Sequence, residues 1–233
     1  MCNSWGNALK MYNWTVNLRH FTGADNYSTY FNRTILPHEV VQFEDTFRRI
    51  IDDNGSFEVA GEVCFWKNYG NIQARSKLTQ SLLTHLVIRA NWDTFIRATR
   101  EISNNPSFAN FLALRNACNQ PRGFATPITF LAFYNPKKFP MVDKHIANWW
   151  RTLKARYGYD QAPVFSQRED GWIHAVGVQR NIQNWDAYIA WKTFCCDYSK
   201  KIQKNCELDW RARDVEIAVW MAQQNGLDLT VFQ

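Results

Sequence analysis

The chain has 233 residues, a formal net charge of +6 and a hydrophobic content of 46%. A chain of this length and composition can bury a full core, which excludes a disordered or fibrous protein and predicts a single domain over residues 1–233. No apolar run approaches the length of a membrane span, so a membrane-spanning protein is excluded too. The basic balance permits an anionic partner, and nucleic acid and a membrane surface both qualify.

The cysteines show no metal-binding pattern. None of the six forms a C-x-x-C pair, and an adjacent pair such as Cys195-Cys196 seldom ligates one metal. We therefore expect reduced thiols at Cys2, Cys64, Cys118, Cys195, Cys196 and Cys206, and no metal. The first residues do not resemble a signal peptide, so we expect a cytoplasmic protein.

Most of the chain shows helical spacing of its apolar residues. Residues 1–36 are the exception, because they show no sustained helical spacing, and we expect them to lie over the core. Residues 158–171 contain Pro163 and mixed charges, which is typical of a surface loop. An all-α fold of about nine or ten helices is the prediction, with helices expected at residues 37–51, 59–68, 76–90, 91–102, 108–117, 124–134, 142–157, 184–203 and 210–223.

Two of these helices carry charges that need an interpretation. The helix at residues 142–157 has a basic outer face formed by Lys144, Arg151, Lys154 and Arg156. In the helix at residues 210–223, Glu216 stands beside an apolar side, and the simplest interpretation is a solvated or capping carboxylate.

Residues 119–150 contain the most informative pattern. A tight turn around Gly123 precedes an apolar helix, and a proline-punctuated loop then leads to Asp143. Backbone N–H groups of such a turn, at a helix start, are where a phosphate would be held. Asp143 opens the next helix, so it is either an ordinary N-cap, the commoner case for an arbitrary Asp, or a catalytic carboxylate on a rigid helix end.

The stretch from Gly123 to Ile146 resembles the core of the helix-hairpin-helix DNA glycosylases. In that family a hairpin Gly precedes a helix, and a proline-containing loop leads to a Val-Asp-x-His-Val/Ile motif. This chain has Pro140, Val142-Asp143 and His145-Ile146 at matching positions. The resemblance implies a glycosylase-like fold of two closely packed helical lobes with a cleft between them. The hairpin would lie at about residues 108–134, and the catalytic loop and helix at about residues 135–157.

Two residues depart from the family pattern. Members with lyase activity carry a Lys two residues after the matched Gly, where this chain has Ala125, so the Schiff-base nucleophile is missing. Pro121 stands where the first hairpin Gly is usual.

The resemblance also implies a set of site residues. Asp143 would be the catalytic carboxylate, stabilising an oxocarbenium-like sugar and activating water. The hairpin would grip one phosphate through the backbone N–H groups of Arg122, Gly123 and Phe124, with the Thr126 hydroxyl and Lys144 as further DNA contacts. No cofactor is implied, although the hairpin allows a structural monovalent cation.

A glycosylase must turn its target base out of the duplex, and the base then enters a pocket with aromatic walls. Trp66, Lys67 and Tyr134 are its candidates, against the commoner alternatives of a core Trp and a solvated Lys. His145 belongs to the motif, yet a lone His is more often structural than a general acid.

Three functions remain open. The first is a monofunctional DNA N-glycosylase that excises a damaged or modified base from double-stranded DNA, acting as a monomer at the nucleoid. The second is a non-catalytic DNA-binding protein that recognises altered bases or DNA structure. The third, a helical protein-interaction domain, would use the aromatic surplus to line a protein groove.

Overall fold

The computed structural model describes residues 3–23, 27, 29–120, 123–206 and 209–232. Over these residues the chain is helical apart from one two-stranded sheet, which confirms the all-α class. The chain divides into two compact units. We call residues 13–135 the middle unit, and residues 1–12 together with 136–233 the terminal unit.

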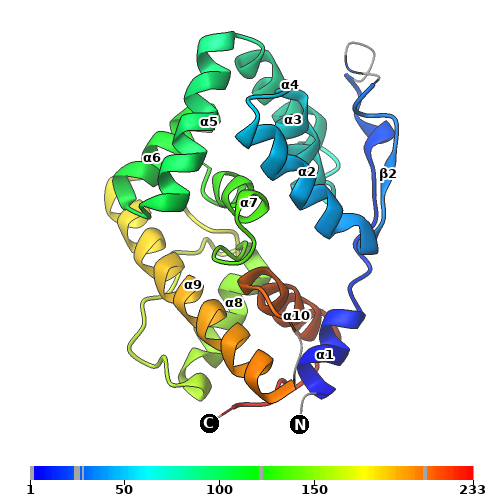
Figure 1. The fold of residues 1–233 in the computed structure, drawn as a ribbon. Helices are drawn as coiled ribbons and strands as arrows, with labels where there is room; N and C mark the ends of the chain where they lie inside the picture. Colours follow the sequence, from blue (N-terminus) through cyan, green and yellow to red (C-terminus); the bar gives the residue numbers. More distant parts are fainter. Residues whose placement is uncertain (1–2, 24–26, 28, 121–122, 207–208, 233) are drawn as a thin grey trace. The chain divides into compact units, whose positions relative to one another are not determined.

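The middle unit holds the first half of the predicted helices. A short antiparallel sheet comes first, in which β1 (Val16–Asn17) pairs with β2 (Thr34–Ile35). 3-10 helices follow the strands at Leu18–His20 and Pro37–Glu39. The α-helices are α2 (Val40–Asp52), α3 (Glu58–Lys67), α4 (Arg75–Leu86), α5 (Arg89–Asn104), α6 (Phe108–Ala117) and α7 (Ala125–Tyr134) (Figure 1).

The helix α7 is the centre of the middle unit. Its sequence is apolar on every side, and a helix of that kind is stable only when neighbours surround it. It contacts α2, α3, α5 and α6, and its residues 127–133 are all buried. Phe130 packs edge-on against Phe95 with ring centroids 5.1 Å apart. The Thr129 hydroxyl donates to the Ala125 carbonyl at 2.9 Å, so the polar group on this helix is satisfied.

The terminal unit is built in the same way around α10 (Ala212–Asn225). This helix contacts α1 (Asn3–Lys10), α8 (Lys144–Leu153) and α9 (Val178–Cys206). A 3-10 turn at Lys154–Tyr157 extends α8. Gly226 ends α10 in the left-handed conformation, with φ of 63°, as its position after the last apolar residue predicts.

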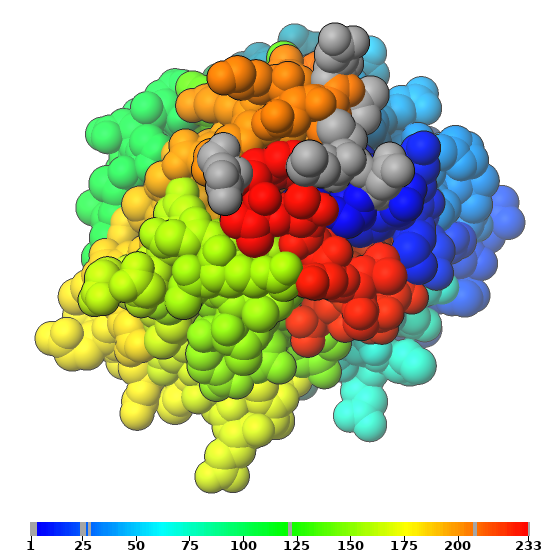
Figure 2. All heavy atoms as spheres, turned by 90° about the horizontal axis from the view of Figure 1, so that it is seen from below, coloured from blue at the N-terminus to red at the C-terminus, as the bar shows by residue number. Residues whose placement is uncertain are grey.

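The helix α1 lies within residues 1–36, where the spacing of apolar residues did not predict a helix. Trp5 is fully buried, and its indole N–H donates to the Thr230 carbonyl at 2.7 Å. The Ser4 and Thr230 hydroxyl oxygens are 2.7 Å apart. The blue N-terminal and red C-terminal segments accordingly lie side by side in Figure 2. Eight residues are too few to show a helical period, and tertiary contacts of Trp5 stabilise the helix instead.

Residues 158–171 form the expected loop, with one addition, since Gln167 pairs with Ile173 in an isolated antiparallel bridge. One further expectation is corrected in the terminal unit. Lys154 is not on a solvated face, since its side chain is buried and its ammonium group donates to the Tyr159 and Asp160 carbonyls.

Within the described residues, which do not include Cys2, the cysteines are mostly as expected. Cys64, Cys118 and Cys195 are buried free thiols and Cys196 is a partly exposed one. Cys206 is disulfide-bonded, which corrects the expectation of a reduced thiol there. Whether two cysteines pair depends on which parts of the chain the fold brings within bonding distance, and sequence spacing does not reveal that.

Candidate active site

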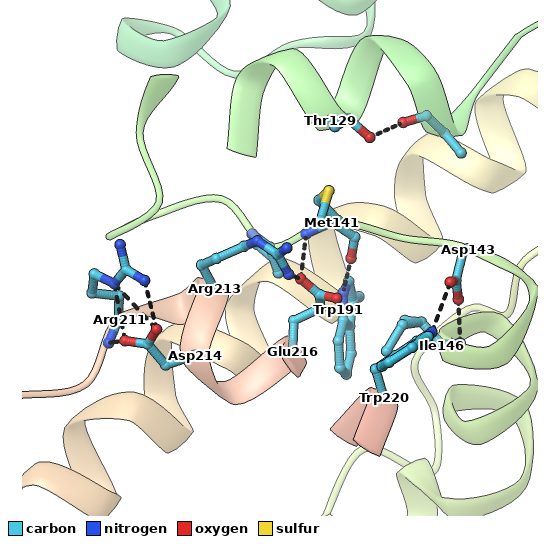
Figure 3. Close-up of polar contacts among 12 residues, drawn as sticks. Thr129, Met141, Asp143, Ile146, Trp191, Arg211, Arg213, Asp214, Glu216 and Trp220 are labelled. Atoms are coloured by element: carbon cyan, nitrogen blue, oxygen red, sulfur yellow. Dashed lines mark hydrogen bonds and ion pairs between the residues drawn. The ribbon is translucent and has the colours of Figure 1, made fainter. Parts of the chain in front are cut away.

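Asp143 is held by three hydrogen bonds at the start of α8. Its Oδ1 accepts from the backbone N–H groups of His145 and Ile146, both at 2.9 Å, and its Oδ2 accepts from the Trp220 indole N–H at 3.1 Å (Figure 3). The N-cap alternative is therefore confirmed. The side chain is partly exposed, so the cap is accessible to solvent. A catalytic role for the same carboxylate stays a prediction.

The loop before Asp143 is anchored from α9. The Tyr188 hydroxyl donates to the Pro140 carbonyl at 3.0 Å, and the Trp191 indole N–H donates to the Met141 carbonyl at 3.0 Å. Both donors are buried, so the bonds replace water that cannot reach these carbonyls. The backbone leading to the carboxylate is consequently fixed in place.

A buried ion pair anchors the same loop from α10. Glu216 Oε2 accepts from the Met141 N–H at 3.3 Å and from the guanidinium of Arg213 (Figure 3). Arg213 and Glu216 are only 1% and 4% exposed. The expectation of a solvated or capping Glu216 is therefore wrong, because the carboxylate is shielded from water and bonded to the adjacent loop.

The contacts of His145 are structural, as is usual for a lone His. Its backbone N–H is one of the donors to Asp143, and its ring stands edge-on to the Trp220 ring at 6.4 Å and 89°. Lys144 has its ammonium group 5.2 Å from the centroid of the exposed Trp172 ring.

The hairpin residues belong to the middle unit, whereas Asp143 and Lys144 belong to the terminal unit. Arg122 lies outside the described residues. The Gly123 N–H donates to the Gln120 carbonyl at 2.9 Å, so this group is already engaged within the turn. Phe124 is buried against Phe111, with ring centroids 4.9 Å apart, and Thr126 is half-buried in the first turn of α7.

The three base-pocket candidates all lie in the middle unit. Trp66 is 3% exposed and packs edge-on against Phe133, which fits the alternative of a core Trp. Lys67 is half-buried at the end of α3. The Tyr134 hydroxyl donates to Asp52 at 2.8 Å. Desolvation, reinforced by the Asp52 carboxylate, raises the pKa of the Tyr134 hydroxyl.

One polar site of the middle unit escaped the sequence analysis. Arg33 forms a two-point ion pair with Glu62, at 3.2 and 3.3 Å, and borders a cavity of about 240 Å³ that Gln42 and Thr46 also line. Burial, only partly offset by Arg33, raises the pKa of Glu62 to about 7. The sequence signal that could have revealed this site is the presence of the Glu62 carboxylate inside the apolar run of residues 59–66.

The described residues contain no cluster of His, Cys, Asp or Glu that could hold a metal ion. Among the same residues, no helix is both long and apolar enough to cross a bilayer. In comparisons with known proteins, no family model, no curated protein and no solved structure matches the chain.

Proposed function

We propose that the chain is a monofunctional DNA N-glycosylase in which Asp143 is the catalytic carboxylate. In addition to the motif at residues 142–146, one structural observation supports the proposal. The carboxylate is partly exposed, yet its position is determined by three N–H groups and by three buried side chains that bond the preceding loop. Catalysis by electrostatic stabilisation requires this combination of access and rigidity.

The chemistry follows from the charge that develops on the sugar. As the N-glycosidic bond breaks, the electron pair leaves with the base and the anomeric carbon becomes cationic. A fixed carboxylate beside that carbon lowers the energy of this state. Water then adds to the carbon and loses a proton, for which Asp143 is the acceptor. With Ala125 in place of the lyase Lys, no covalent intermediate on that residue is expected.

The test is Asp143→Asn. The amide oxygen still caps α8, because Asn and Asp are comparable N-caps, while the negative charge and the acceptor for the Trp220 N–H are lost. We expect unchanged DNA binding and loss of base release, by about a hundredfold or more if the charge supplies a stabilisation typical of such groups. Base release is measured as alkali-dependent strand scission across a panel of modified duplexes, with mass spectrometry of the freed base.

Two variants serve as controls. Asp186→Asn removes an exposed carboxylate from α9, and activity should be unchanged. Trp220→Phe removes the donor to Asp143 Oδ2 and keeps an aromatic ring, so it should lower base release less than Asp143→Asn. If Asp143→Asn releases base at the wild-type rate, the mechanism is rejected.

A non-catalytic DNA-binding protein is the second candidate, and one observation favours it. Both oxygens of Asp143 already accept hydrogen bonds, as they would in a cap with no other task. The two candidates differ in one readout. Alkali-dependent scission at a modified base appears only for the glycosylase, whereas selective retention of modified DNA without scission identifies the binding protein.

A further inference from the structure

The hairpin formed by residues 166–174 presents an aromatic ring beside the start of α8. Trp172, directly after the turn at residues 168–171, is 44% exposed, and the Lys144 ammonium group lies 5.2 Å from its ring centroid. Lys144 directly follows Asp143. The ring therefore contacts a side chain from the first turn of α8, and both belong to the same unit of the chain as Asp143.

The tip of this hairpin is held by its own backbone. The Arg168 N–H donates to the Trp172 carbonyl and the Gly171 N–H donates to the Arg168 carbonyl, both at 2.9 Å. Gly171 has φ of 81°, a left-handed value that glycine adopts without a steric cost. Asp170 Oδ1 accepts from the Trp172 N–H at 3.2 Å, which fixes the residue that bears the ring.

The base of the hairpin is clamped from α9. Asn184 is fully buried, its Oδ1 accepts from the Ser166 N–H at 2.8 Å, and its amide group donates to the His174 carbonyl at 3.2 Å. One side chain thus bonds both arms, which are also joined by the His174 N–H and the Ser166 carbonyl at 2.7 Å. Figure 2 shows yellow-green spheres of this part of the chain projecting from the surface.

An exposed Trp on a rigid arm suits a planar ligand. Lys144 covers part of the ring, and the rest of the ring is exposed to solvent. A second planar group can pack on this exposed part, and an unstacked nucleobase is planar and polarisable enough to do so. The ammonium group adds a positive charge beside the base, where a nucleic acid has a phosphate. A paired base within a duplex offers no free face, so the ligand must present an unpaired one.

We infer that Trp172 and Lys144 form a stacking platform for an unpaired nucleobase and its phosphate. The inference rests on the proposed function, because both take DNA as the ligand, and it identifies the DNA structure that is preferred. Stacking of a base on an aromatic side chain is sequence-tolerant. The platform should therefore distinguish unpaired from paired DNA rather than one base from another.

The test uses the full chain and three fluorescent DNA probes. Each carries 2-aminopurine, either in a single strand, opposite an abasic-site analogue in a duplex, or fully paired. We expect the wild type to bind the first two more tightly than the third and to quench the fluorescence of the unpaired 2-aminopurine. Trp172→Ala should weaken binding to the first two probes by about tenfold or more and abolish the quenching. Trp172→Phe should keep most of both.

Val178→Ala is the matched control, since it removes another exposed apolar side chain at the start of α9. Far-ultraviolet circular dichroism confirms that each variant is folded. If the wild type binds DNA and Trp172→Ala binds and quenches as the wild type does, the platform is refuted while the proposed function stands. If the wild type binds none of the probes at low salt, both are refuted.

Discussion

At the scale of single residues, two carboxylates of this chain meet opposite conditions. Asp143 is partly exposed and accepts three N–H bonds, so its oxygens are satisfied without a cation. Glu62 is 3% exposed and has the Arg33 guanidinium as its charged partner. Desolvation outweighs that attraction and raises the pKa of Glu62 to about 7, from an ordinary value of 4.5. The proposed catalysis uses the first carboxylate, and the second predicts that stability depends on pH.

The pH dependence has a definite sign. The folded protein binds the Glu62 proton more tightly than the unfolded chain, so the unfolding free energy falls as pH rises from about 4.5 to about 7. The difference between the pKa of Glu62 in the folded protein and its ordinary value corresponds to about 3 kcal/mol of unfolding free energy. Glu62→Gln does not titrate and should lack this loss, whereas the exposed Glu101→Gln should keep it. Urea denaturation at pH 5 and pH 8 measures the difference, and equal losses in all three proteins would contradict the assignment.

At the scale of elements, the loop of residues 136–141 and α10 satisfy each other's backbone groups. The N–H groups of Ala212 and Arg213 have no partner inside the helix, and they donate to the Lys137 and Pro136 carbonyls at 3.3 and 3.1 Å. In return, Glu216 accepts from the Met141 N–H. The start of α10 and the approach to Asp143 are therefore one cooperative structure.

Removal of Glu216 tests this coupling. Glu216→Ala leaves the Arg213 charge buried without its carboxylate, and the unfolding free energy should fall by about 3–5 kcal/mol. Asp93→Ala breaks the exposed Arg89–Asp93 pair on α5 and should cost about 1 kcal/mol or less. Urea denaturation of both variants supplies the comparison. A small loss for Glu216→Ala, equal to that of Asp93→Ala, would show that the buried pair does not anchor the loop.

At the scale of the whole molecule, the net charge of +6 is the property most relevant to DNA. Four cations stand on the loop and the helix that flank Asp143, namely Lys137, Lys138, Lys144 and Arg151. Lys154 does not join them because its ammonium group is bonded to backbone carbonyls. Counterion release by these four side chains would make DNA affinity strongly dependent on salt.

We expect the logarithm of the DNA association constant to fall with the logarithm of salt concentration at a slope of about −3 to −4. Lys138→Gln should make the slope shallower by about 1 for every DNA sequence, and Lys77→Gln, which replaces an exposed cation on α4, should leave it unchanged. Fluorescence anisotropy over a salt series measures both slopes. A slope near zero for the wild type would contradict DNA binding through these cations.

Local sequence signals predict the helical class, the helices from residue 37 onward and a helix that starts at Asp143. Apolar spacing, glycine stops and an Asp before an amphipathic run are local signals that hold wherever the helix packs. Long-range contacts instead establish the helix α1, the hairpin of residues 166–174 and the burial of Glu62, Lys154 and Glu216. A short helix depends on its neighbours, and a charged side chain has the same local pattern whether its partner is water or a distant part of the chain. The resemblance to glycosylases identified Asp143 but not Trp172, because an exposed aromatic acquires a possible role only from the residues that the fold places beside it.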